Sequence, residues 1–403
     1  MIPKTPIHSR RAHAARLALS LTVGVAVAAC DRSPSSPMAV SSPAHNITPC
    51  TVTNPCDPPP PPPFDNSAFG VVSWVNYDNN PLFIDLAANA HVAWVRLPAN
   101  WNALQPNGAG TLDPDELGKL RATVHDLKLR GISSYVSLAY TPAWTRYCYR
   151  NVADGQEYSA QPGEETIPCA TNMYSPPDPA MYIWWHSFVG MMLDSLPEVH
   201  DWSIWNEPNT QFFLNLPAGQ DPIEAYANLV VWAADQIHRR PGYRVLAPEL
   251  AYSSDSRAKP GQQSNGEWLG EFIRTTGYLV DVVTVHGYNP AQNIVATMAD
   301  YGNNRMQYMP AGIPLWLTEA GGGGTDHNDD ATQAKDLTAV YRAMTSHQVP
   351  RWQKTFWFSL YFPPNVPEQP YYQLTRQAGT VLRPAYNCLS ALASGTSLPL
   401  GCL

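Results

Sequence analysis

Two glutamates, Glu207 and Glu319, carry the most specific chemical signal in the sequence. Each directly follows a short apolar run: Glu207 lies in WNEPN, and Glu319 lies in WLTEA, which four glycines follow. Hydrolysis of a glycosidic bond needs two carboxyl groups, one to protonate the leaving oxygen and one, ionised, to attack the sugar carbon. Alone, either glutamate could be a helix N-cap partner or a surface charge. As a pair at two strand ends, they indicate chemistry on a sugar.

The two glutamates can meet only if both runs belong to one sheet. From residue 69 onward, eight apolar, β-branched runs alternate with longer stretches of helical period. Such continuous runs indicate strands that are buried on both faces, as in parallel sheets. The predicted strands are Phe69–Val75, Val92–Leu97, Ile132–Ala139, Asp201–Trp205, Tyr243–Ala247, Val280–His286, Leu315–Thr318 and Thr355–Leu360. The predicted helices are 81–90, 114–130, 178–195, 221–239, 265–276, 291–302, 328–347 and 380–393.

Eight strand–helix units predict an α/β fold, the (β/α)8 TIM barrel, as one catalytic domain over residues 66–403. In this fold the site lies at the carboxyl ends of the strands, so the fourth and seventh strands bring Glu207 and Glu319 to one mouth. The second helix has clear boundaries, with an N-cap at Asp113, a proline at N1 and Gly131 after its end. A doubly wound sheet is the alternative, but no GxGxxG sequence follows the first strand.

Composition excludes several other classes of protein. Only 14% of the 403 residues are charged and the net charge is −8, with no Lys/Arg cluster after the first 20 residues. A disordered chain, a coiled coil or a nucleic-acid-binding protein is therefore not expected. The chain has no HExxH, GxSxG or CxxC sequence, and no Lys-Ser/Thr follows the four glycines. We expect no metal and no cofactor. The 13 Trp and 20 Tyr suit stacking on sugar rings, although core packing explains many of them equally well.

The N-terminal residues have the pattern of an export signal. Four cationic residues precede an apolar run over 17–29, which ends in VAA before Cys30. This predicts a lipoprotein signal peptide over residues 1–30, with Cys30 as the lipid-bearing residue; an ordinary secretory signal is the alternative. Residues 31–65 are rich in Pro and Ser and predict a linker. We expect a protein of the cell envelope, on the periplasmic or cell-surface side, that contacts the membrane through its N-terminal lipid only.

The cysteine count agrees with this compartment. Without Cys30, six of the seven cysteines remain, and an even number in an oxidising compartment suggests disulfides. Six cysteines allow fifteen pairings, of which nearness along the chain favours Cys50–Cys56, Cys148–Cys169 and Cys388–Cys402.

The sequence around Glu207 resembles clan A of the retaining glycoside hydrolases, and families 5 and 39 most. Asn206-Glu207-Pro208 matches the clan's signature at the end of strand 4, and the resemblance covers about residues 66–395. It implies that Glu207 is the acid/base, that Glu319 on strand 7 is the nucleophile, and that Asn206 binds the sugar 2-hydroxyl. Family 39 xylosidases carry an added β-sandwich, for which few residues follow the eighth unit here, so an exo-xylosidase is not expected.

The resemblance also implies supporting residues. Tyr288, in the sequence His286-Gly287-Tyr288, and Arg96 would hold the nucleophile, and Trp357 would floor the −1 subsite. The alternatives are structural: Arg96 as a buried ion pair, His286 as a core histidine and Trp357 as barrel filling.

Further residues after the predicted strands could line a sugar groove. Trp144 has the best placing, while Trp74, Trp101, Tyr140 and Glu249 are weaker candidates, and Glu249 could equally be a loop charge.

The sequence thus predicts a monomeric retaining β-glycoside hydrolase that acts on a polysaccharide or oligosaccharide. A non-catalytic carbohydrate-binding lipoprotein and a transglycosylase with the same site are the alternatives.

Overall fold

The structure is a computed structural model of the chain. It describes residues 64–73, 81–145, 147–150, 157–159, 167–168, 173–210, 212–216, 220–251, 265–288, 290–322, 329–360, 362 and 372–403. The chain divides into two units, residues 1–61 and 62–403, and all described residues belong to the second. The predicted signal peptide and Cys30 lie outside the described residues, as does the linker up to residue 63. None of the described helices combines the length and the apolar character that a membrane span requires.

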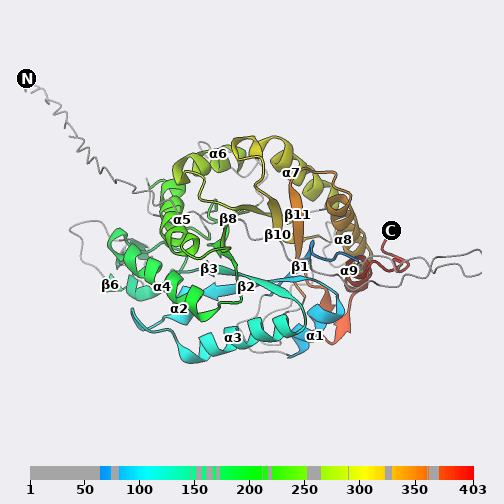
Figure 1. Cartoon of the computed structure of the whole chain (residues 1–403), viewed down its shortest axis with the longest axis horizontal. Helices are drawn as coiled ribbons and strands as arrows, with labels where there is room; N and C mark the ends of the chain where they lie inside the picture. The colour runs from blue at the N-terminus through cyan, green and yellow to red at the C-terminus, as the bar shows by residue number, and fades with distance from the viewer. Residues whose placement is uncertain are drawn as a thin grey trace, which may run out of the picture. The chain divides into compact units, whose positions relative to one another are not determined.

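Eight parallel strands close into a barrel, which confirms the predicted TIM-barrel fold (Figure 1). Around the barrel each strand pairs with the next, and the last pairs back with the first. In this order the strands are β1 (Phe69–Val72), β2 (Trp94–Asn100), β3 (Ser133–Ala139), β7 (Asp201–Ile204), β8 (Arg244–Leu250), β9 (Val282–Tyr288), β10 (Leu315–Gly321) and β11 (Trp352–Phe358).

Helices form a ring around the barrel (Figure 1). The long ones are α1 (Pro81–Asn89), α3 (Pro114–Leu129), α4 (Tyr182–Ser195), α5 (Pro222–His238), α6 (Asn265–Thr276), α7 (Ala291–Asn303), α8 (Asp330–Thr345) and α9 (Pro384–Ser394). The second predicted helix is α3, and its N-cap is confirmed because the Asp113 side chain accepts from the backbone N–H groups of Asp115 and Glu116.

The remaining elements are short. They are the helices α2 (Trp101–Leu104), η1 (Ala143–Thr145), η2 (Pro179–Met181) and η4 (Arg305–Tyr308), a sheet of β4 (Tyr147–Arg150), β5 (Glu157–Ser159) and β6 (Ile167–Pro168), and a pair of β12 (Thr375–Arg376) and β13 (Val381–Leu382).

Two separate cores stabilise the barrel. The larger one includes apolar residues from the strands and the surrounding helices. The smaller one contains Tyr135, Trp316 and Phe356, from β3, β10 and β11, in edge-to-face and tilted contact with one another. Because β3 lies apart from the neighbouring strands β10 and β11 in the barrel order, the Tyr135 ring can meet the other two only in the barrel interior. Aromatic side chains therefore fill part of the barrel.

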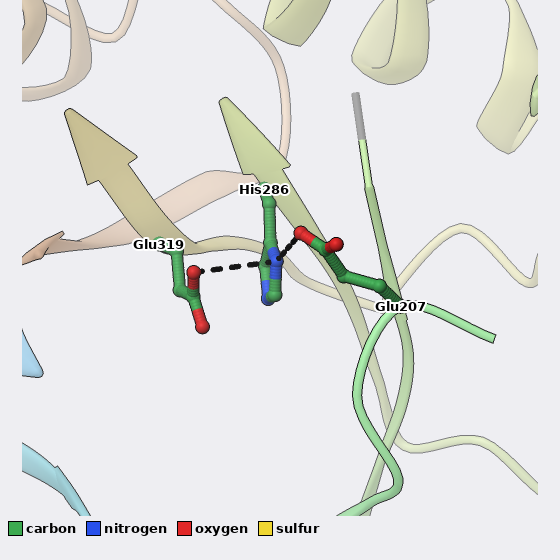
Figure 2. Close-up of side chains that lie close together, drawn as sticks. All are labelled: Glu207, His286 and Glu319. Atoms are coloured by element: carbon green, nitrogen blue, oxygen red, sulfur yellow. Dashed lines mark hydrogen bonds and ion pairs between the residues drawn. The ribbon is translucent and has the colours of Figure 1, made fainter. Parts of the chain in front are cut away.

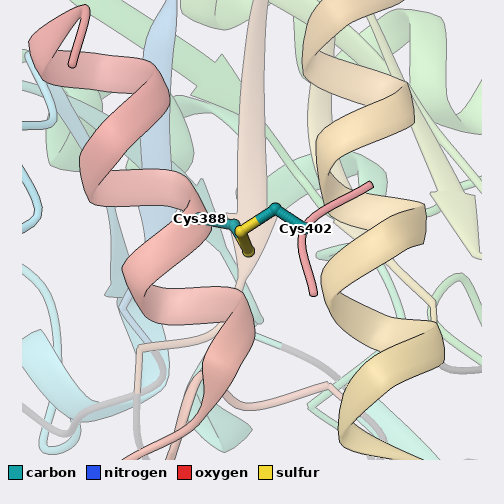
Figure 3. Close-up of a disulfide and its surroundings, with 2 residues drawn as sticks. All are labelled: Cys388 and Cys402. Atoms are coloured by element: carbon teal, nitrogen blue, oxygen red, sulfur yellow. A yellow bond between two sulfur atoms is a disulfide. The ribbon is translucent and has the colours of Figure 1, made fainter. Parts of the chain in front are cut away.

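A disulfide joins α9 to the C-terminal residues (Figure 3). It links Cys388 and Cys402, both buried, and confirms one of the three predicted pairs. For the other two pairs, Cys50, Cys56 and Cys169 lie outside the described residues.

Candidate active site

Polar side chains from four strands, and from the turn that follows a fifth, converge in the barrel. Arg96 comes from β2, Glu249 from β8, His286 from β9 and Glu319 from β10, and Glu207 lies just after β7. The structure brings the sequence-predicted pair together. One side-chain oxygen of Glu207, one of Glu319 and one ring nitrogen of His286 all lie within 4.8 Å of one another (Figure 2).

The backbone departs from regular strand geometry where these carboxylates arise. Glu207 and Glu249 have positive φ values of 45° and 55°, and Trp205, just before the turn, has 68°. The pairing register also shifts between residues 247 and 250 of β8 and between 317 and 319 of β10. Left-handed non-glycine residues and bulges are uncommon and cluster at functional sites, where they redirect side chains. These irregularities turn three carboxylates toward one centre.

The Glu319 carboxylate is held at both oxygens. Arg96 donates from Nη1 to Oε1, and the Tyr288 hydroxyl donates to Oε2. The other guanidinium nitrogen, Nη2 of Arg96, donates to Oδ1 of Asn206 at 2.9 Å. Burial and then the Glu319 charge raise the pKa of Tyr288, so its hydroxyl stays protonated and remains a donor. Two donors, one of them cationic, fix the orientation of the Glu319 carboxylate.

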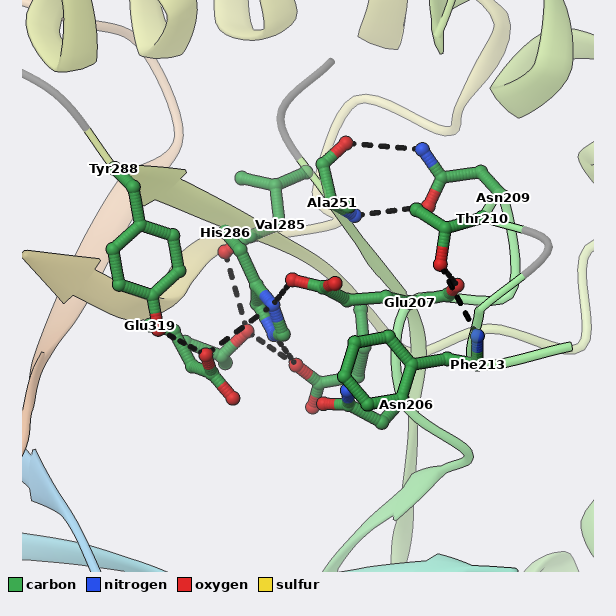
Figure 4. A network of polar contacts seen from close by, with 12 residues as sticks. Asn206, Glu207, Asn209, Thr210, Phe213, Ala251, Val285, His286, Tyr288 and Glu319 are labelled. Carbon is green, nitrogen blue, oxygen red and sulfur yellow. Dashed lines mark hydrogen bonds and ion pairs between the residues drawn. The ribbon is translucent and has the colours of Figure 1, made fainter. Parts of the chain in front are cut away.

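Glu207 is more open, and its carboxylate bonds to a histidine. Its side chain is 15% exposed, and Nδ1 of His286 lies 2.7 Å from Oε1. The backbone N–H of Glu207 donates to the carbonyl of Glu249 at 3.1 Å, which ties the residue to β8. The backbone and hydroxyl of Thr210 both donate to the Glu207 carbonyl at 3.0 Å. Asn209 then exchanges two hydrogen bonds with the backbone of Ala251, so the whole turn is held against the end of β8 (Figure 4).

Glu249 belongs to the same cluster as Glu207 and Glu319 and is fully buried. Its Oε2 accepts from Thr318 at 2.5 Å, lies 2.9 Å from Nε2 of His286, and is 3.9 Å from Nη2 of Arg96. Burial alone would raise the pKa of Glu249, but the Arg96 guanidinium and then His286 lower it to about 2. Burial alone would lower the pKa of His286, but the three surrounding carboxylates, Glu319 first, raise it to about 10.

Aromatic rings lie on the Glu207 side of the site. Tyr140, after β3, packs on Trp205 with ring centroids 6.0 Å apart and on Tyr174 at 5.2 Å. Tyr174 in turn contacts Phe212 at 5.3 Å and Phe213 at 5.6 Å. Phe212 is 66% exposed, which is unusual for so large an apolar ring.

Two of the predicted sugar-binding tryptophans lie elsewhere. Trp357 is fully buried in the larger core, between strands and helices, and its Nε1 donates to the backbone carbonyl of Tyr372 at 3.1 Å. Its neighbour Phe358 belongs to the smaller core inside the barrel, and its ring centroid lies 6.1 Å from that of Tyr288. Successive strand residues point to opposite faces, so the expected floor role of Trp357 does not fit its position. Trp144 is partly buried, donates to Gln105 at 2.7 Å and packs edge-on against Trp101.

The weaker candidates for a sugar groove have different positions in the structure. Trp101 is fully buried and therefore cannot line a groove, and Trp74 lies outside the described residues. Glu249 is no loop charge, because it belongs to β8 and to the buried network. Sequence reasoning missed Thr318, Tyr174 and Phe212. Only Thr318 had an available signal, its place as the last residue of a predicted strand.

The trio of Glu207, His286 and Glu319 has the donor types of a metal site. However, both oxygens of Glu319 already accept hydrogen bonds, and the Arg96 cation lies directly against one of them. A metal ion would have to displace these donors and would be repelled by the guanidinium. The arrangement suits proton transfer and nucleophilic attack better.

Comparisons with known proteins agree with this chemistry. A family model described as the glycosyl hydrolase catalytic core matches residues 194–385, which contain Glu207, Glu249, His286 and Glu319. No curated protein matches the sequence.

Solved structures with a similar fold include three glycoside hydrolases. A family 39 enzyme from Bacteroides cellulosilyticus WH2 has a TM-score of 0.58 at 17% identity, with 82% of this chain and 65% of that chain covered. A monomeric β-xylosidase from Caulobacter crescentus CB15 has a TM-score of 0.56 at 17% identity, with 82% of this chain and 68% of that chain covered. A GH5_18 protein from Streptomyces cattleya, in complex with Manb1-4GlcNAc, has a TM-score of 0.59 at 17% identity, with 82% of each chain covered. These likenesses show the fold, and the chain spans about two thirds of the length of the first two.

Proposed function

We propose that the protein is a retaining β-glycoside hydrolase that cleaves O-glycosidic bonds of an oligosaccharide or polysaccharide. One observation carries the proposal: two glutamates, one held by donors at both oxygens and the other bonded to a histidine and partly open, face each other at the mouth of a TIM barrel. The match to the glycosyl hydrolase catalytic core supports it.

In the first step, Glu319 attacks the anomeric carbon and Glu207 donates its proton to the leaving oxygen. The products are the free leaving-group alcohol and a glycosyl ester on Glu319. In the second step, Glu207, now ionised, takes a proton from water, which attacks the same carbon and releases the sugar. Hydrogen bonds from Arg96 and Tyr288 hold the Glu319 carboxylate in a fixed orientation between turnovers.

The spacing of the pair supports retention over inversion. Retaining enzymes hold their carboxyl groups about 5–5.5 Å apart, whereas inverting enzymes leave about 6.5–9.5 Å for a water molecule. An oxygen of Glu207 and one of Glu319 lie within 4.8 Å of each other, a close approach that fits the shorter of these two spacings.

The aromatic rings beside Glu207 support a sugar on the leaving-group side. Tyr174 and the exposed Phe212 could present flat apolar faces to a sugar ring there. The neighbouring structures name a β-xylosidase and a complex with Manb1-4GlcNAc, which are different sugars. A panel of xylan, mannan, β-glucans and aryl β-glycosides, with products sized, identifies the sugar and separates hydrolysis from transfer to another sugar.

Two variants test the assigned roles. Glu319→Gln should abolish turnover because no glycosyl ester can form. Glu207→Ala should lose about 10²–10⁴-fold on natural substrates but retain the first step on aryl glycosides with good leaving groups. Added azide should then accelerate its second step and yield a β-glycosyl azide. A β-azide from Glu319 variants instead would reverse the two roles. No cleavage of any panel substrate by the wild-type protein would favour a purely carbohydrate-binding role.

We also propose that the protein is lipid-anchored through Cys30 at the cell envelope. The apolar run before Cys30 and the proline-rich segment after it support this. Cys30→Ser should release the protein from the membrane fraction or block its processing, and unchanged fractionation would contradict the anchor.

A further inference from the structure

Glu249 cannot touch a substrate, yet it contacts the histidine that bonds the acid Glu207. Its side chain is 0% exposed, and that of His286 is 0% exposed as well. His286 therefore lies between a buried carboxylate at Nε2 and the catalytic carboxylates at Nδ1, with 2.7 Å to Glu207 and 3.6 Å to Glu319 (Figure 2). Neither ring nitrogen faces water.

The protonation state of His286 decides where the acid proton can lie. A neutral imidazole donates at one nitrogen and accepts at the other. Glu249 is ionised and can only accept, so Nε2 carries a proton. If the ring were neutral, Nδ1 would be an acceptor, and the proton of Glu207 would point from Oε1 into the histidine. If the ring is a cation, Nδ1 donates to Oε1, and the proton of Glu207 must reside on Oε2.

The buried charges balance only with a cationic ring. In the form that the proposed function requires, Glu207 carries its acid proton, and Arg96 and His286 supply two positive charges against the two negative charges of Glu249 and Glu319. Uncompensated buried charge is costly, which favours this neutral set. With a neutral His286, the same set would carry one excess negative charge.

Among the described residues, the ionisable groups that face His286 or its partners are Arg96, Tyr135, Tyr140, Glu207, Tyr226, Glu249, Tyr288 and Glu319. Burial is the largest cause that raises the pKa of each of the four tyrosines, which therefore stay neutral. Burial alone would lower the pKa of Arg96, but its surroundings, Tyr135 first and then Glu249 and Glu319, raise it, so Arg96 stays charged.

We propose that Glu249 is a positioning residue that holds His286 as an imidazolium, which keeps the acid proton of Glu207 on Oε2. The proposal rests on the proposed function, because it explains how Glu207 remains available as an acid. After the proton has left, the same cation stabilises the ionised Glu207 that activates water.

The direct test is the charge on His286, which needs no substrate. Nitrogen-15 NMR of histidine-labelled protein distinguishes an imidazolium from either neutral tautomer, and His286→Gln assigns the signal among the 11 histidines. In the wild-type protein we expect both ring nitrogens to be protonated at pH 7. A neutral ring at pH 7 would overturn the proposal without any variant.

Glu249→Gln then tests the source of the charge. We expect the midpoint of the His286 titration to fall by more than about one pH unit, a tenfold change in the proton equilibrium. Thr318→Val is the matched control, because it removes a hydrogen bond to the same Oε2 atom but no charge. It should leave the midpoint close to that of the wild type. An unchanged midpoint in Glu249→Gln, or an equal fall in both variants, would refute the role of the charge.

Kinetics with two leaving groups separates proton positioning from simple structural damage. Glu249→Gln should lower kcat/KM about 10- to 100-fold for a poor leaving group, which needs the acid. For an activated aryl leaving group, kcat/KM should change little. Equal losses for both would show a structural role only. If the wild-type protein cleaves no glycoside, the proposed function fails while the NMR result still decides the charge on His286.

Discussion

Gly321 leaves space for the Tyr288 ring, whose hydroxyl donates to Glu319. It is the last residue of β10, two residues after Glu319, and a Cβ at this position would lie 2.9 Å from the Tyr288 ring and 2.8 Å from the Tyr372 ring. Contact between carbon atoms is comfortable only beyond about 3.5 Å, so in Gly321→Ala the Tyr288 ring must move by about half an ångström or more. The hydroxyl that donates to Oε2 of Glu319 would move with it.

The size of the effect follows from that hydrogen bond. A hydrogen bond to a charged group contributes about 1.5–3 kcal/mol, which corresponds to about 10- to 150-fold in rate if the bond is needed to orient the nucleophile. Tyr288→Phe removes the hydroxyl outright and should lower kcat/KM by this factor. Gly321→Ala displaces the same hydroxyl and should lower kcat/KM by the same factor or somewhat less.

A double-mutant cycle tests whether the two changes share one cause. We would measure kcat/KM of both single variants and the double variant on an aryl glycoside, where this constant reports the first chemical step. If Gly321→Ala acts through the Tyr288 hydroxyl, the double variant should be about as active as Tyr288→Phe alone. Losses that multiply would refute the reasoning, because they would show that the added methyl group acts elsewhere, for example through Tyr372.

Three further predictions concern stability and binding. Cys388→Ser with Cys402→Ser removes a disulfide that closes a loop with a sequence separation of 14 and should lower the free energy of unfolding by about 3 kcal/mol, as measured by urea titration; a loss too small to measure would contradict this. Phe212→Ala should raise KM for oligosaccharides but not for aryl monoglycosides, and equal effects on both would remove Phe212 from the leaving-group side. The pKa of His286 is raised in the folded state to about 10, so its stabilising contribution is complete below its unfolded pKa of about 6.5 and declines as the pH rises toward 10. The stability difference between wild type and His286→Gln should therefore shrink over that range, and a constant difference would argue against a charged ring.

The course of the barrel was predictable because each strand is a continuous apolar run and several helices have clear capping residues. The ends of the strands were less predictable. β8, β9 and β10 continue two or three residues beyond their predicted ends, through Glu249, Tyr288 and Glu319. Polar residues after an apolar run resemble the start of a loop, but here they stay in the strand because partners on other strands satisfy them.

Two residues show what local sequence does not contain. Glu249 looked equally like a loop charge, because its burial depends on a register shift against β9 and on partners far away in the chain. Trp357 was assigned to the wrong face, because a strand buried on both faces has no polar alternation to distinguish inside from outside. The proximity of Glu207 and Glu319 was easier to predict, since both directly follow apolar runs whose carboxyl ends meet in this fold.

The pairing of β1 with β11 also has a consequence for biogenesis. Gly70 lies beside Phe356 in the sheet, and Arg96 reaches Glu319 across 223 positions of the chain. Contacts between such distant segments form late, after a large loss of chain entropy. During synthesis, the nascent chain therefore keeps Glu207 and Glu319 outside a closed barrel until the eighth strand is available. Recovery of activity during refolding should consequently report closure of the β-barrel. A chain truncated before β11 should be inactive and degraded by proteases rather than a weakened enzyme.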